Sequence, residues 1–120
     1  MAKLVIIDDL DTEIELMKMA LAPGGYDIHT AADAETGIDL VKKESPDAIL
    51  LDVVLPGMDG FAACRKLKKE DSTKNIPVIL ISSKSEESDK FWGLKQGASD
   101  YVFKPFDGDA LLNTVKQYAN

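Results

Sequence analysis

The sequence contains a single cysteine, a single histidine and a single arginine among its 120 residues. One cysteine, Cys64, cannot form an internal disulfide, and one histidine, His29, cannot build a His-rich metal site or a mechanism that needs a pair of histidines. Fourteen Lys and Arg face 21 Asp and Glu, so the net charge is −7, which disfavours non-specific binding to nucleic acid or to an anionic membrane. These shortages indicate a cytoplasmic protein kept in a reducing compartment.

Long hydrophobic runs are also missing. No apolar stretch approaches the about 20 residues that a bilayer span needs, and the first apolar run, Leu4–Ile7, meets an acidic pair before it could serve as a signal peptide. With 45% hydrophobic and 29% charged residues, the chain has the composition of a globular protein. Its length suits one domain over residues 1–120, and we expect no membrane insertion.

Two kinds of apolar segment alternate along the chain. Short continuous runs, typical of strands buried in a parallel sheet, occupy residues 4–7, 48–51 and 78–81, with weaker candidates at 26–31 and 101–103. Between them, apolar residues recur at helical spacing, and on the fourth of five expected helices Phe91 and Leu94 mark the apolar stripe. Five strands alternating with five helices predict a three-layer α/β sandwich with right-handed crossovers.

The expected strands end in polar residues that carry chemistry. The first ends in Asp8 and Asp9, the third in Asp52, the fourth in Ser82 and Ser83, and the fifth in Lys104 and Pro105. Because parallel strands bring their carboxyl ends to one edge of a sheet, these side chains should meet there. Three carboxylates at such an edge repel one another unless a cation sits among them or some take up protons, and Mg²⁺ is the simplest cation for oxygen ligands.

The same set suits the formation of an acyl phosphate on a carboxylate. A metal ion and Lys104 would screen the incoming charge, and the hydroxyl of Ser82 could donate a hydrogen bond to the transferred oxygens. Asp52 is the best candidate nucleophile because it stands alone after a buried strand, whereas Asp8 and Asp9 are adjacent and suited to holding the ion. Taken alone, Asp8 and Asp9 fit the cap of a following helix equally well.

From about Lys3 to Ala119 the chain resembles the receiver domain of two-component response regulators. The resemblance rests on four signatures in order: residues 7–9 (IDD), residues 51–60 (LDVVLPGMDG), residues 81–83 (ISS) and residues 104–106 (KPF). It implies a (βα)5 flavodoxin-like fold with a parallel five-stranded sheet of order 2-1-3-4-5. It also implies a cis Lys104–Pro105 bond, where sequence alone would favour trans. Residues 82–85 (SSKS) with residues 91–98 (FWGLKQGA) most resemble single-domain regulators of chemosensory systems that control type IV pilus (twitching) motility.

The resemblance assigns roles by position. Asp52 would accept the phosphoryl group, Asp8, Asp9, Asp52 and the carbonyl of Val54 would hold Mg²⁺, and Lys104 would contact the phosphoryl oxygens. Ser82 and Tyr101 would be the switch residues. The partners implied are a histidine kinase or phosphotransfer protein and a downstream output protein, met by a surface containing Trp92, Lys95 and Tyr101. We expect a monomer or a weak phosphorylation-dependent dimer that binds no nucleic acid directly.

Other readings remain open at this point. A phosphatase that works through an aspartyl-phosphate intermediate needs a second acid two residues after the nucleophile, where this chain has Val54. A docking module that acts independently of phosphate would not need every site group, yet all are present. We therefore expect a phosphoacceptor switch that catalyses only its own phosphotransfer and dephosphorylation.

No DNA-binding element follows Asn120, so we expect a stand-alone receiver, although a piece of a longer regulator would also fit. Trp92 fits either the edge of the core or an exposed anchor.

Overall fold

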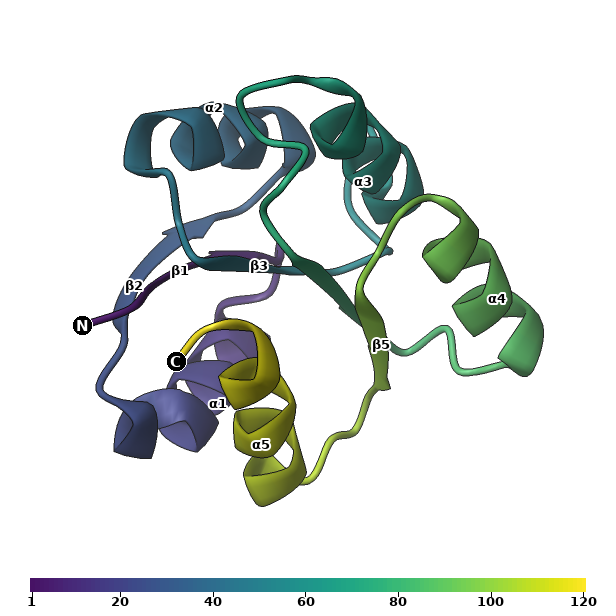
Figure 1. Ribbon diagram of the computed structural model, residues 1–120. Helices are drawn as coiled ribbons and strands as arrows, with labels where there is room; N and C mark the ends of the chain where they lie inside the picture. The colour runs from purple at the N-terminus through teal and green to yellow at the C-terminus, as the bar shows by residue number, and fades with distance from the viewer.

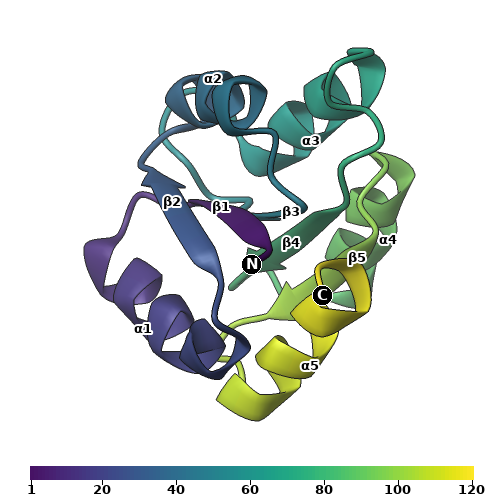
Figure 2. The same ribbon diagram turned by 60° about the vertical axis from the view of Figure 1, so that its left-hand side comes forward.

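The fold is a parallel sheet between two layers of helices, seen in a computed structural model that describes residues 1–120 (Figure 1). All five strands run in the same direction in the order β2-β1-β3-β4-β5, which confirms the topology predicted from the resemblance (Figure 2). In chain order the elements are β1 (Lys3–Ile7), α1 (Asp11–Leu21), a short 3-10 helix (Ala22–Gly24), β2 (Asp27–Ala31), α2 (Ala34–Glu44), β3 (Ala48–Leu51), α3 (Gly60–Lys69), β4 (Val78–Ser82), α4 (Glu87–Lys95), β5 (Asp100–Phe103) and α5 (Gly108–Tyr118).

The central strands are apolar throughout because both faces of the sheet are covered. Side chains alternate along β1, so Val5 and Ile7 join the core beneath α2 and α3, while Leu4 and Ile6 join the core beneath α1 and α5. The two weaker strand candidates are β2 and β5, which form the edges of the sheet. No helix in the structure is both long enough and apolar enough to cross a membrane.

Short polar side chains begin several helices. Asp33, Asp59 and Asp107 each accept a hydrogen bond from the backbone N–H three residues on, at 2.8, 2.8 and 3.0 Å, and so cap α2, α3 and α5. Helix α4 instead begins with a capping box in which Glu86 and Asp89 each bond the other's backbone N–H.

Helix α4 departs from the sequence prediction. The apolar stripe expected from Phe91 and Leu94 faces solvent, with 63% and 42% of these residues exposed. Gly93 is the residue of α4 that is buried, and a Cβ there would come within 2.7 Å of Leu80 and 2.9 Å of Tyr101. The helix therefore packs against the sheet through its smallest residue and turns its largest residues outward.

Candidate functional site

The polar residues at the strand ends meet at one edge of the sheet, as the sequence predicts. Carboxylate oxygens of Asp8, Asp9 and Asp52 lie within 4.8 Å of one another. The backbone N–H of Asp52 donates to the carbonyl of Ile7 at 2.9 Å, so the pairing of β1 with β3 continues to the point where the acidic residues begin. Parallel pairing of neighbouring strands thus brings together carboxylates that lie more than 40 residues apart in the sequence.

The three carboxylates have different surroundings. Asp8 is fully buried and accepts hydrogen bonds from the backbone N–H of Leu10 at 3.0 Å and from Lys104 Nζ at 2.7 Å. Asp52 is 5% exposed and accepts from the backbone N–H of Val54 at 3.2 Å, while Lys104 Nζ lies 3.4 Å from its other oxygen. Asp9 is exposed and lines the mouth of the pocket. Lys104 therefore binds Asp8 more closely than Asp52, so the negative charge of Asp52 is the less fully compensated of the two.

Burial controls the ionisation of this site. Burial, helped by the negative charge of Asp8, raises the pKa of the Asp52 carboxyl above its ordinary value against the opposing effect of Lys104. Burial would lower the pKa of Lys104, but the hydrogen bond to Asp8 and the charge of Asp52 outweigh it, so the pKa of Lys104 is raised. The ammonium stays charged, and a cation added among the carboxylates would relieve the cost of ionising Asp52.

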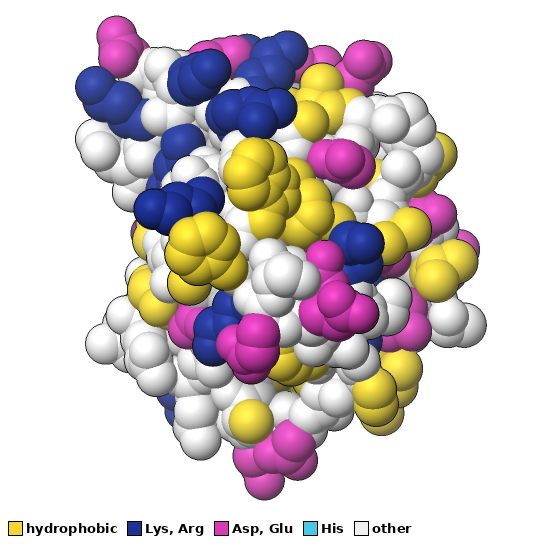
Figure 3. All heavy atoms as spheres, turned by 90° about the vertical axis from the view of Figure 1, so that its right-hand side faces the viewer, with side chains coloured by type: hydrophobic (Ala, Val, Ile, Leu, Met, Phe, Trp, Pro, Cys, Tyr) yellow, Lys and Arg dark blue, Asp and Glu magenta, His cyan; other side chains and the backbone are white.

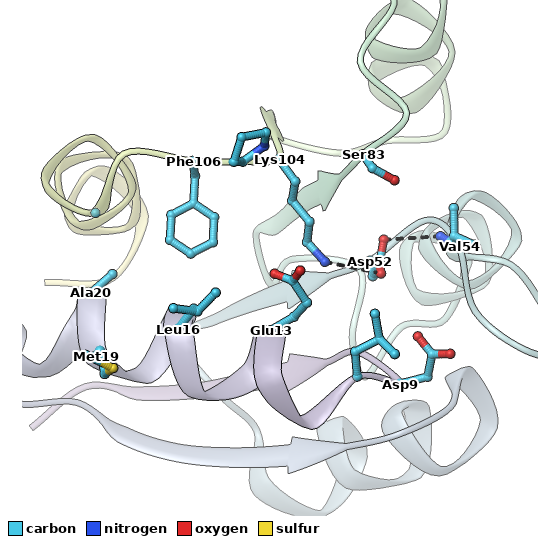
Figure 4. A pocket seen from close by; sticks show the side chains of 13 residues that line it. Asp9, Glu13, Leu16, Met19, Ala20, Asp52, Val54, Ser83, Lys104 and Phe106 are labelled. Carbon is cyan, nitrogen blue, oxygen red and sulfur yellow. Dashed lines mark hydrogen bonds and ion pairs between the residues drawn. The ribbon is translucent and has the colours of Figure 1, made fainter.

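A pocket of about 790 Å³ opens beside Asp52 (Figure 4). Its polar end is formed by Asp9, Asp52 and Lys104, and Figure 4 shows Lys104 extending toward Asp52. The rest runs along α1 to Phe106 and is mainly apolar, with lining residues that include Leu10, Leu16, Met19 and Ala20. Asp52 therefore borders a pocket that a phosphoryl donor could enter.

The two serines at the end of β4 play different parts in the structure. Ser82 is fully buried, and its hydroxyl oxygen accepts a hydrogen bond from the backbone N–H of Lys84 at 3.2 Å. Ser83, which the sequence places at the same strand end without a chemical role, lines the pocket. The alternation of side chains along a strand could have flagged Ser83, since consecutive residues face opposite ways.

Tyr101 lies beneath the surface rather than on it. It is 5% exposed, and its hydroxyl donates to the carbonyl of Lys84 at 2.6 Å. Of the three residues predicted for a partner surface, only Trp92 and Lys95 are therefore exposed, Trp92 by 50%. This places Trp92 outside the core and favours the exposed-anchor reading of that residue. The Lys104–Pro105 bond is cis, as the resemblance implies.

Comparison with known proteins identifies the family. The family model for the response regulator receiver domain matches residues 4–116. The chain belongs to this family. It is therefore the receiver domain of a two-component response regulator, a class of phosphoacceptor switches rather than of enzymes acting on an external substrate.

Full-length similarity to individual proteins agrees with this assignment. The chain is 42% identical over 115 residues to Protein PilH of Pseudomonas aeruginosa, covering 96% of this chain and 95% of that protein. A solved protein of Chloroflexus aurantiacus J-10-fl, assigned as a response regulator, superposes with a TM-score of 0.93 at 35% identity and covers 98% of this receiver and 96% of that chain. Chemotaxis protein CheY4 of Vibrio cholerae superposes with a TM-score of 0.90 at 28% identity, covering 98% of both chains.

Proposed function

We propose that Asp52 is the phosphoacceptor of this receiver and that a histidine kinase or phosphotransfer protein is the donor. In the transfer, the P–N bond of a phosphohistidine breaks as an O–P bond forms to a carboxylate oxygen of Asp52, and the P–N electron pair returns to the imidazole. The observation that carries the proposal is the difference between two buried carboxylates: both oxygens of Asp8 are engaged by close donors, whereas Asp52 borders the pocket.

The residues at the site fit a bound Mg²⁺. Asp8, Asp9, Asp52 and the carbonyl of Val54 would hold the ion, which supplies positive charge that offsets the charge of the transferred phosphoryl oxygens. Lys104 Nζ lies 3.4 Å from Asp52 and is placed to pair with those same oxygens. The chain's own contribution is therefore to orient Asp52 through the N–H of Val54, to place Lys104 beside it and to leave it bordering the pocket.

A contiguous set of contacts leads from the site to α4. The backbone N–H of Lys84 bonds the hydroxyl of Ser82, and the carbonyl of Lys84 accepts from Tyr101. The ring of Tyr101 in turn lies against Gly93 of α4. A phosphoryl oxygen on Asp52 would accept a hydrogen bond from the hydroxyl of Ser82, and the resulting movement of Ser82 and Tyr101 would reposition α4 and the surface that contains Trp92 and Lys95.

The proposal places this switch in the cytoplasm, as a single domain over residues 1–120 that is a monomer or a weak phosphorylation-dependent dimer. It hydrolyses its own acyl phosphate and signals to an output protein without contacting nucleic acid. The resemblance of residues 82–85 and 91–98 and the similarity to Protein PilH support a place among regulators of type IV pilus motility.

Labelling with acetyl phosphate tests the phosphoacceptor. With Mg²⁺ present, we expect the intact mass to rise by one phosphoryl group in the wild type and not in Asp52→Asn. Asp39→Asn, which makes the same change at an exposed position of α2, should label like the wild type. Equal labelling of Asp52→Asn would overturn the assignment. Turnover of a phosphate monoester would instead favour the phosphatase reading.

A further inference from the structure

The pocket beside Asp52 is larger than the transfer of a phosphoryl group requires. Its volume of about 790 Å³ lies within the range of about 300–1,000 Å³ that is usual for pockets that bind small organic molecules. The groups that would contact phosphoryl oxygens and Mg²⁺, among them Asp9, Asp52 and Lys104, lie at one end of it. The rest of the volume is therefore available to an organic group attached to the phosphorus.

The other end of the pocket has apolar walls, which we call the apolar arm. They are formed by Leu16, Met19 and Ala20 of α1 and by Pro105 and Phe106 between β5 and α5. Figure 4 shows Phe106, Leu16 and Ala20 beyond Lys104, on the side away from Val54. Leu16 is 51% and Met19 71% exposed. Exposed apolar side chains that line a hollow next to a reactive carboxylate indicate a binding site for an apolar group.

The apolar arm is long enough for a short aliphatic chain. Figure 4 shows Glu13 between Lys104 and Leu16, at the junction with the polar end of the pocket. Leu16 and Ala20 follow Glu13 by three and seven residues, so the three side chains share one face of α1. From Glu13 to Ala20 the helix advances about 10 Å, at about 1.5 Å per residue. An extended chain of several carbons can therefore lie along the arm.

The direction of phosphoryl transfer places the leaving group on the open side of the phosphorus. Asp52 attacks roughly in line with the bond that breaks, so the leaving group lies on the side away from the Asp52 oxygen. In an acyl phosphate, the P–O bond to the acyl oxygen breaks as the bond from Asp52 to phosphorus forms, and the electron pair leaves on a carboxylate. The chain of that carboxylate is still attached in the transition state, so its contact with the apolar arm raises the second-order rate constant of transfer.

We propose that the apolar arm binds the acyl chain of a small acyl phosphate, so that this receiver takes phosphoryl groups faster from donors with an uncharged aliphatic chain than from acetyl phosphate. Apolar walls favour the burial of methylene groups and disfavour a charged chain, which would lose its hydration there. The inference rests on the proposed function in taking Asp52 as the acceptor, and it adds the class of small-molecule donor.

Rates of labelling by acetyl and butyryl phosphate test the inference, with intact mass in the presence of Mg²⁺ to distinguish gain of a phosphoryl group from gain of an acyl group. Acetate and butyrate are leaving groups of nearly equal basicity, so a difference in rate constant reports the added methylenes. We expect butyryl phosphate to react at least about fourfold faster, since one fully buried methylene is worth about fourfold and the open arm covers each of the two only in part.

The outcomes separate the inference from the proposed function. Equal rate constants for the two donors would overturn the inference and leave the assignment of Asp52 intact. Labelling of the wild type by neither donor would contradict the proposed function itself. Hexanoyl phosphate should also react faster than adipoyl monophosphate, in which a chain of the same length ends in a carboxylate, and the opposite order would overturn the inference.

Leu16→Asn locates the contact because it makes one wall of the apolar arm polar. The ratio of the butyryl to the acetyl rate constant should fall below about twofold in this variant. Figure 3 shows hydrophobic side chains gathered also on the side of the molecule that carries α4, where Leu94 is 42% exposed and lines no pocket. The matched control Leu94→Asn should therefore keep the wild-type ratio. An equal fall in both variants would show that the apolar arm is not the cause.

Binding without transfer gives an independent measurement. In 2-oxoheptylphosphonate a methylene replaces the bridging oxygen of hexanoyl phosphate, so the phosphoryl group cannot leave. With Mg²⁺ present, this analogue should shift the NMR signal of the Met19 ε-methyl group, which lines the apolar arm, and leave that of Met58, which lies outside this pocket, unchanged. The shorter 2-oxopropylphosphonate should shift the Met19 signal less. Equal shifts with the two analogues, or no shift with either, would overturn the inference.

Discussion

Asp8 and Asp52 are both aspartates at the ends of neighbouring strands, but their contacts differ, and so do the roles that they can take in the site. Asp8 has no exposed surface and holds Lys104 at 2.7 Å, so its charge is compensated within the protein. Asp52 is farther from Lys104, at 3.4 Å, and burial raises the pKa of its carboxyl. A partly compensated, pocket-facing carboxylate is the one that gains most from a cation or an incoming donor.

Cys64 offers a prediction at the residue scale. Burial raises the pKa of its thiol from 9.0 to about 11, and its Sγ donates to the carbonyl of Gln96 at 3.7 Å. The folded state thus keeps the thiol proton to higher pH than the unfolded chain does. The stability that Cys64 contributes is fully present below pH 9 and is lost as pH rises toward about 11, by roughly 2 kcal/mol.

Urea unfolding at pH 8 and at pH 10.5 measures this effect. The free energy of unfolding should fall more steeply with pH in the wild type than in Cys64→Ala, because only the wild type carries the buried thiol. Parallel curves for the two proteins would contradict the prediction.

Single residues also show how far sequence reasoning reaches. Asp8, Asp9 and Asp52 could be predicted to meet because they follow recognisable buried strands, and Lys104 because it follows a weaker strand candidate, since parallel strands end at one edge. Strand alternation predicts that Ser82 and Ser83 face opposite ways, but which of the two faces the pocket could not be predicted, since a shift of one residue in the end of β4 reverses them. The buried position of Tyr101 depends likewise on packing against Gly93, which no local pattern encodes.

At the scale of elements, the strands were predictable and the orientation of α4 was not. Continuous runs of Val, Ile and Leu locate β1, β3 and β4 to within a residue, because both faces of those strands are buried. For α4 the apolar spacing of Phe91 and Leu94 was misleading. A Cβ at Gly93 would come within 2.9 Å of Leu80 and Tyr101, so the helix approaches the sheet most closely at its smallest residue, and Phe91 and Leu94 are left facing solvent.

The start of α3 gives a prediction for a whole element. Gly60 is the first residue of α3 and is buried, and a Cβ there would overlap the carbonyl oxygen of Asp52 and come within 2.6 Å of Val53 Cα. These are backbone atoms of the segment that carries the phosphoacceptor, so they cannot move aside as a flexible side chain could. We expect Gly60→Ala to lower the free energy of unfolding by about 2–4 kcal/mol, although alanine favours helix by up to about 1 kcal/mol.

Gly108 is the matched control because it opens α5 behind Asp107 as Gly60 opens α3 behind Asp59. A Cβ at Gly108 would lie 3.5 Å from Ala20, an ordinary contact. Gly108→Ala should leave stability unchanged or raise it by up to about 1 kcal/mol. Chemical denaturation of both variants checks the pair, and similar losses in the two would show that contact with the Asp52 segment is not the cause.

For the molecule as a whole, the same topology that buries an apolar sheet also concentrates charge. Five parallel strands direct their carboxyl ends to one edge, where three carboxylates share the neighbourhood of one lysine. The folded state therefore carries a repulsion that the unfolded chain, with the same carboxylates far apart, does not. A divalent cation bound only by the folded state should remove that cost and appear as added global stability.

Magnesium should therefore stabilise the wild type against unfolding, by about 2.7 kcal/mol at a concentration one hundred times its dissociation constant. Asp9 is exposed, and its replacement removes a negative charge without opening a cavity. In a chelating buffer we thus expect Asp9→Asn to be as stable as the wild type or more so. In Mg²⁺ the wild type should be the more stable protein, because Mg²⁺ should raise the free energy of unfolding of Asp9→Asn by less than half as much as that of the wild type.

Thermal and urea unfolding with and without Mg²⁺ measure the stability of both proteins in both conditions. The control Asp39→Asn on α2 should gain as much stability from Mg²⁺ as the wild type does. An equal gain in Asp9→Asn would mean that the ion binds elsewhere, since a site built from Asp8, Asp9 and Asp52 must weaken when one of its three charges is lost.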